Sequence, residues 1–168
     1  METLATLLTA VRDCDICAAN LPLGPRPVVH VDVSARILII GQAPGTRVHE
    51  SGIPWNDPSG DRLRQWLNID REQFYSDKRL AIMPMGFCYP GKGRSGDLPP
   101  RKECAPHWHE RLLAQMPSIE LVLLIGQYAQ NYYLNDAFKT LTERVENHSA
   151  DSYFFPLPHP SPRNQLWL

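Results

Sequence analysis

The sequence has no long apolar run, no internal repeat and no linker. None of its apolar stretches approaches the roughly 18 residues that a membrane-spanning helix requires. Its start, METLATLLTAVRDC, is polar and amphipathic, unlike a signal peptide. We therefore expect a cytoplasmic protein with no membrane contact. With 168 residues and 43% apolar content, the chain predicts one domain over residues 1–168, expected as a monomer, with a single substantial core.

The sequence also lacks an excess of charge of one sign. The formal net charge is −1, whereas a domain that binds nucleic acid non-specifically is usually plainly basic. A few basic groups around one groove would still suffice for brief contact with DNA, and one short segment holds Lys92, Arg94, Arg101 and Lys102. An ordinary solvated loop is the simpler explanation of these charges from the sequence alone.

Four short apolar runs alternate with helical patterns along the chain. The runs predict buried strands at residues 35–41, 79–86, 119–126 and 152–158. Ser59 is expected to cap the second of the predicted helices, which cover residues 2–12, 59–67, 101–116 and 127–133. This alternation predicts a three-layer α/β/α domain with a central, mostly parallel four-stranded sheet. Ligands collect at the carboxyl ends of such strands, which are the loops after Ile40, Met85, Ile125 and Leu157.

The four cysteines form one close pair, Cys14 and Cys17, and one distant pair, Cys88 and Cys104. Two ligands with two residues between them can chelate one metal centre, while the fold must bring in the distant pair. Structural disulfides are not expected in a cytoplasmic chain. A zinc ribbon usually has a second close pair, so zinc is an alternative rather than the first choice. Four unrelated free cysteines are a further alternative.

Three motifs in order resemble the uracil-DNA glycosylase superfamily. The cysteine spacing with CYPGKGRSGDLPPRKEC looks like the ligand set of the iron–sulfur (family 4) branch, and ILIIGQAPGTRVHESGIPW resembles the strand, glycine loop and aromatic segment of that branch. HPSPRN is similar to the superfamily's second signature motif, in the form of the single-strand-selective branch. The resemblance spans Cys14 to Asn164. It implies the superfamily's fold, DNA with a damaged or deaminated base as partner, and a [4Fe–4S] cluster on Cys14, Cys17, Cys88 and Cys104.

The implied reaction hydrolyses the C1′–N1 bond of a nucleotide that has been flipped out of the DNA stack. The resemblance implies that His159, held by the prolines of its turn, donates a hydrogen bond to the departing base. It places Trp55 where the family has a stacking phenylalanine. An exposed turn histidine and a simple core tryptophan are the alternatives for these two residues.

The sequence departs from the family pattern where an attacking water would be positioned. Family 4 has a glutamate at the position of Gln42, and another branch has an aspartate at the position of Ala43, so neither carboxylate is present. Gln42 can orient a water but cannot take its proton. We expect Asp57 to supply the missing negative charge, with Asp61 and Glu50 as weaker candidates. A turn role is the alternative for Asp57.

The remaining candidate residues concern binding. Pro84 stands where family 4 has an asparagine that contacts the base edge, and proline offers no donor. The pocket should therefore be less selective for uracil, or built for another base. Close approach of the backbone to sugar or phosphate is expected at Gly41, Ala43, Pro44 and Gly45. Contacts to phosphates are expected from Ser161, Arg163 and Asn164, with surface placement without contact as the alternative.

We therefore expect a monofunctional glycosylase that excises uracil or a related deaminated base and carries a [4Fe–4S] cluster. A catalytically weak or inactive iron–sulfur relative that binds nucleic acid is the alternative, and a structural protein with zinc or a cluster is a third. The family's domain normally continues into a helix after the second motif. Since the sequence ends at Leu168, four residues after Asn164, we expect that helix to be absent or the chain to be shortened.

Overall fold

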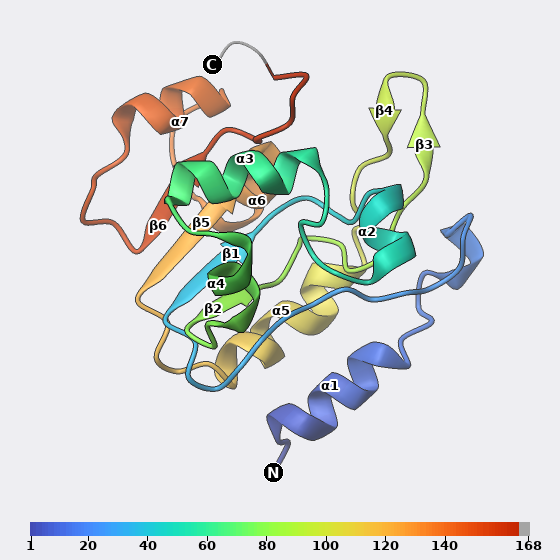
Figure 1. The fold of residues 1–168 in the computed structure, drawn as a ribbon. Helices are drawn as coiled ribbons and strands as arrows, with labels where there is room; N and C mark the ends of the chain where they lie inside the picture. Colours follow the sequence, from blue (N-terminus) through green and yellow to red (C-terminus); the bar gives the residue numbers. More distant parts are fainter. Residues whose placement is uncertain (165–168) are drawn as a thin grey trace.

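A four-stranded sheet forms the centre of the computed structural model, which describes residues 1–164 (Figure 1). The strand order is β2-β1-β5-β6, and every neighbouring pair is parallel. The strands of the sheet are β1 (Ile37–Ile40), β2 (Leu80–Ile82), β5 (Leu121–Ile125) and β6 (Phe154–Leu157). Helices cover both faces, so the prediction of a three-layer α/β/α fold around a parallel four-stranded sheet is confirmed.

The helices of the described residues include the predicted ones and several shorter ones. They are α1 (Leu4–Arg12), α2 (Thr46–Ser51), α3 (Pro58–Leu67), α4 (Arg71–Ser76), α5 (Cys104–Ala114), α6 (Gln127–Tyr133) and α7 (Leu141–Asn147), with a 3-10 turn at Ala18–Asn20. The four predicted helices correspond to α1, α3, α5 and α6. The sequence did not indicate α2, α4, α7 or the antiparallel hairpin of β3 (Lys92–Gly93) and β4 (Gly96–Asp97). These elements are too short for a periodic pattern to show.

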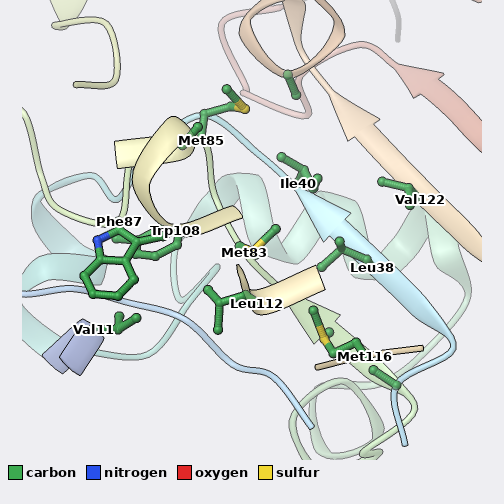
Figure 2. Close-up of a cluster of buried hydrophobic side chains, with 14 of the residues drawn as sticks. Val11, Leu38, Ile40, Met83, Met85, Phe87, Trp108, Leu112, Met116 and Val122 are labelled. Atoms are coloured by element: carbon green, nitrogen blue, oxygen red, sulfur yellow. The ribbon is translucent and has the colours of Figure 1, made fainter. Parts of the chain in front are cut away.

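Successive side chains of β1 point to opposite faces of the sheet, as the period of a strand requires. Leu38 and Ile40 pack with α1, α5 and the segment that follows β2 (Figure 2). Ile39 packs on the other face with Leu63 of α3 and Phe74 of α4. Both faces of the central strand are therefore buried, which explains why its sequence is apolar throughout instead of alternating.

The expected cap of α3 was wrong. Asp57, not Ser59, caps this helix, because its Oδ1 accepts a hydrogen bond from the Gly60 N–H at 2.8 Å. Pro58 occupies the first helical position, where a missing N–H costs nothing. Asp57 therefore has the structural role that was the alternative to a catalytic one, since it caps the turn that begins α3.

Pro84 explains a strand boundary that the apolar pattern did not predict, whereas Pro106 interrupts no helix. The strand expected over residues 79–86 ends at Ile82, because Pro84 has no N–H with which to continue the ladder. Pro106 lies in the first turn of α5, where N–H groups have no intrahelical partner, so the helix runs through it.

The order of the strands reverses beside β1. The chain adds β2 on one side of β1 and later adds β5 and β6 on the other. The loops after β1 and β5 therefore leave in different directions, and such a divergence opens the crevice where α/β sheets bind ligands. Within residues 1–164, no helix combines the length and apolar character needed to cross a bilayer. The chain after Asn164, to which the expectation about a terminal helix applies, lies outside the described residues.

A buried histidine joins α5 to the segment after β2. The His109 side chain donates from Nε2 to the Pro84 carbonyl oxygen at 2.9 Å, so Nδ1 accepts from the Tyr133 hydroxyl at 2.5 Å. Burial lowers the pKa of His109 to about 4. The imidazole is therefore neutral in the folded protein at neutral pH, and the hydrogen bonds fix which nitrogen carries the proton.

We expect the free energy of unfolding to fall as the pH is lowered from 6.5 to 4. Over that range the unfolded chain takes up a proton at His109 and the folded chain does not, which costs up to about 3 kcal/mol. Urea denaturation at several pH values measures the slope. The variant His109→Gln should reduce it, whereas His107→Gln, which changes an exposed histidine of the same helix, should not. An unchanged slope in His109→Gln would refute this assignment.

Candidate active site

A cavity of about 630 Å³ lies at the carboxyl ends of the strands. The loop after β1, the turn after β6 and the β3–β4 hairpin line it, with the start of α3. Every binding or catalytic residue expected from the sequence lines this one cavity, namely Gly41, Gln42, Ala43, Pro44, Gly45, Trp55, Asp57, His159, Ser161, Arg163 and Asn164. The structure thus brings together three segments that lie far apart in the sequence. The weaker candidates Glu50 and Asp61 are not among the described lining residues.

His159 is held by its own turn and by the end of β6. Its Nδ1 accepts the Ser161 N–H at 3.2 Å, and its carbonyl oxygen accepts the Asn164 side-chain amide at 3.1 Å. The fully buried Gln130 of α6 donates to the carbonyl oxygens of Leu124 and Leu157 and so ties the root of the turn to β5. Gln130 is a positioning residue that the sequence did not reveal, because a glutamine in a short helix carries no recognisable pattern.

The state of the His159 ring follows from these contacts. Burial lowers the pKa of His159, while the negative charge of Asp57 opposes that shift. Since Nδ1 accepts a backbone N–H, the neutral ring carries its proton on Nε2. His159 therefore presents a neutral hydrogen-bond donor at the cavity, the form that suits an oxygen on which negative charge develops.

Trp55 forms a flat wall beside His159. The two ring centroids lie 5.8 Å apart with an interplanar angle of 32°. The indole approaches the backbone of Gly41 so closely that a Cβ on Gly41 would stand 2.7 Å from the ring. Only glycine permits this approach, which explains why a glycine follows β1 at position 41.

The backbone of Trp55 is in the left-handed region, with φ of 58°, which is rare for a bulky residue. Arg64, buried in α3, donates to the Trp55 carbonyl oxygen at 3.1 Å and to Asp61 at 2.9 Å. The Tyr75 hydroxyl donates to the Pro54 carbonyl oxygen at 2.7 Å. A conformation of this kind costs about 1–3 kcal/mol, and these contacts hold it in place. Asp61, a weaker catalytic candidate, is therefore engaged in supporting Trp55.

Several backbone groups at the end of β2 are paired within the protein. The N–H groups of Met85 and Gly86 donate to the carbonyl oxygens of Gly41 and Gln42, at 2.9 and 3.0 Å. The carbonyl oxygen of Pro84 accepts from His109, as described above. Pro84 lines the cavity and has no backbone N–H, so this residue offers no hydrogen-bond donor there.

The hairpin between β2 and α5 contributes residues that the sequence did not assign to the site, although Lys92 was among the basic groups considered for a groove. Lys92, Ser95 and Asp97 line the cavity, and the Arg163 guanidinium approaches to 3.6 Å from the position of a Cβ on Gly96. The glycine-flanked charges in GKGRSGD were a usable signal for such a hairpin, but they were assigned to a solvated loop. The hairpin adds both signs of charge to the mouth of the site.

A comparison with family models matches residues 28–168 to the uracil DNA glycosylase superfamily. The chain belongs to this superfamily. Membership supports a glycosylase-type hydrolase that acts on DNA, in the general sense of the family. The match covers the GQAPG loop, Trp55 and the turn at His159, whereas Cys14 and Cys17 precede it. The iron–sulfur branch and the individual roles of the site residues stay predictions.

The four cysteines line a second, smaller cavity. Burial raises the pKa of the Cys88 thiol to about 11 and that of Cys104 to about 12, and the neighbouring Cys14 and Cys17 add to both shifts. The Phe87 N–H donates to the Cys104 sulfur at 3.3 Å. Among residues 1–164, no group of three or more His, Cys, Asp or Glu side chains is arranged to hold a metal ion. The four thiols therefore border the same cavity, but they do not form the close group of ligands that a single metal ion requires.

We expect Gly60→Ala to lower the free energy of unfolding by about 3 kcal/mol or more, since a Cβ there would collide with the Trp55 carbonyl oxygen. The matched control is Gly24→Ala, at a glycine with φ of 78° and no atom within 4 Å of an added Cβ. It should cost only about 1 kcal/mol, from backbone strain alone. Urea denaturation compares the two, and equal losses would show that the Trp55 carbonyl does not occupy this space.

Proposed function

We propose that the protein is a monofunctional DNA glycosylase that excises uracil or a related deaminated base. The observation that carries the proposal is the neutral His159, with its proton on Nε2, beside Trp55 in the cavity at the carboxyl ends of the strands. A stacking wall and a fixed donor, side by side, are what excision of a flipped base requires. Superfamily membership supports the same reaction class.

In the proposed reaction the nucleotide leaves the DNA stack and its base lies against the Trp55 indole. Flipping costs a few kcal/mol, and stacking on an aromatic ring returns about 1–3 kcal/mol. The C1′–N1 bond breaks with its electron pair moving to the base, and His159 Nε2–H stabilises the resulting negative charge. A preorganised donor of this kind lowers the barrier by about 3–4 kcal/mol. Gln42 orients the attacking water, and Asp57 places negative charge near the cationic sugar.

Contacts to the DNA backbone would come from the rim of the cavity. Ser161, Arg163 and Asn164 follow His159 closely in the sequence, and Lys92 of the hairpin lines the same cavity. Hydroxyl, amide and cationic groups are the usual partners of phosphate oxygens, and such contacts fix the register of the DNA without reading its sequence. The net charge near zero makes these local groups the main electrostatic attraction for DNA.

We infer that the four cysteines hold an iron–sulfur cluster, as the resemblance to family 4 implies. The four thiols line one cavity, and an all-thiol donor set suits a [4Fe–4S] cluster. Cys14, Cys17, Cys88 and Cys104 would hold it, and the Phe87 N–H would bond one ligand sulfur. Such a cluster would cross-link the N-terminal segment to the segment between β2 and α5. No catalytic step is assigned to it.

A second candidate function is an inactive or weakly active DNA-binding relative. The observation that favours it is the absence of a carboxylate at positions 42 and 43 in the loop after β1. The two functions are separated by a test for excision. End-labelled oligonucleotides, single- and double-stranded, that carry uracil, hypoxanthine, xanthine or thymine would be incubated with the protein and then treated with alkali.

We expect strand cleavage after alkali for at least one of these bases. Parallel samples without alkali test whether Lys92, at the rim of the cavity, also cleaves the strand. The variant His159→Ala should lower the single-turnover rate by at least about 100-fold, because it removes the donor for the departing base. His107→Ala, at an exposed position outside the cavity, is the control. DNA binding without excision of any base would favour the inactive relative, and full activity in His159→Ala would remove this residue from the mechanism.

We expect the purified protein to contain about four iron atoms and four sulfides per chain. Replacing Cys104, whose sulfur also accepts the Phe87 N–H, with serine should abolish iron binding, measured by iron and acid-labile sulfide assays. Zinc at about one atom per chain, or no metal after anaerobic reconstitution, would contradict the cluster.

A further inference from the structure

The hairpin brings a carboxylate to the loop that lacks one. Oδ2 of Asp97, in β4, lies 3.4 Å from the position that a Cβ on Gly45 would occupy. The side chain therefore rests against the backbone at Gly45 of the GQAPG loop and lines the same cavity as Gln42 and Ala43, the positions at which the resemblance predicts a carboxylate. It lines the same cavity as His159 and Trp55.

Asp97 is also uncommitted within the described part of the chain. Neither of its carboxylate oxygens accepts a hydrogen bond from residues 1–164, whereas Oδ1 of Asp57 is engaged by the N-terminus of α3. Lys92 and Arg163 lie close enough to lower the pKa of Asp97, but partial burial and the charge of Asp57 outweigh them and raise it. A carboxylate with a raised pKa is a stronger base than a free aspartate.

The position of Asp97 suits the sugar of a flipped nucleotide rather than its base. The base would lie deep, against Trp55 and His159, while Asp97 is exposed at the mouth of the cavity. A flipped nucleotide enters such a pocket base first, so its sugar stays near the mouth. The atom that water attacks, C1′, would therefore come closer to the hairpin than the edge of the base would.

We propose that Asp97 is the catalytic carboxylate of this site, and this proposal rests on the glycosylase function proposed above. Asp97 aligns a water molecule with C1′. The C1′–N1 bond breaks with its electron pair going to the base, the water oxygen bonds to C1′, and the water proton passes to the Asp97 carboxylate. His159 stabilises the departing base anion, which later takes a proton from solvent. The carboxylate also stabilises positive charge on the sugar before the water bonds.

Single-turnover excision with Asp97→Asn tests the chemical step. The substitution keeps the shape and an acceptor oxygen but removes the base and its charge, so the rate should fall by at least about 100-fold. Asp151→Asn is the matched control, because it makes the same change at an exposed residue outside the cavity. The oligonucleotide carries whichever base the wild-type protein excises. A rate within threefold of wild type in Asp97→Asn, with or without a loss of activity in Asp57→Asn, would overturn the proposal.

A binding measurement separates this proposal from the function on which it rests. Two oligonucleotides are compared, one with a cationic pyrrolidine in place of the target nucleoside and one with neutral tetrahydrofuran. Wild-type protein should bind the cationic analogue at least about tenfold more tightly at fixed salt, and Asp97→Asn should abolish that preference. Taking the ratio cancels the general effect of removing a negative charge near DNA. A preference that survives in Asp97→Asn would overturn the role of Asp97, even if wild-type excision upholds the glycosylase function.

Discussion

The site depends on the parallel alignment of all four strands of the central sheet. Because each strand of the sheet ends at the same edge, the loop after β1 and the turn after β6 meet there although more than a hundred residues separate them. β1 pairs with both β2 and β5, so it is the strand through which the register of the others is set. A slip of one residue in either pairing would exchange the two faces and withdraw Gly41 from the indole of Trp55.

Close backbone contacts then turn this edge into a shaped cavity. Gly41 admits the ring of Trp55, and Gly60 admits its carbonyl oxygen. The same carbonyl accepts from Arg64, whose buried charge is balanced by Asp61. The stacking wall is therefore part of the packing of α3 rather than a side chain on a free loop. Its geometry is set before any substrate arrives, which lowers the cost of ordering it on binding.

The sequence predicted what depends on pattern and missed what depends on position in space. Apolar runs predicted the sheet and the longer helices. The order of the motifs predicted the site residues of two loops, and these residues all line one cavity. The short hairpin at residues 92–97 has no periodicity, and its approach to Gly45 follows from tertiary packing. Ser59 was chosen as a cap because local preference cannot tell which of two neighbouring polar residues starts a helix next to a proline.

The segment that carries Asp97 begins and ends at two of the clustered cysteines, Cys88 and Cys104, which line the same small cavity. A cluster bound there would close this segment into a loop with fixed ends, and closing a loop removes much of its conformational freedom. The β3–β4 hairpin lies within that loop, so its orientation against Gly45 would be set at both ends by the proposed cluster. A centre that takes no part in the chemical step would in this way determine where the proposed catalytic carboxylate stands.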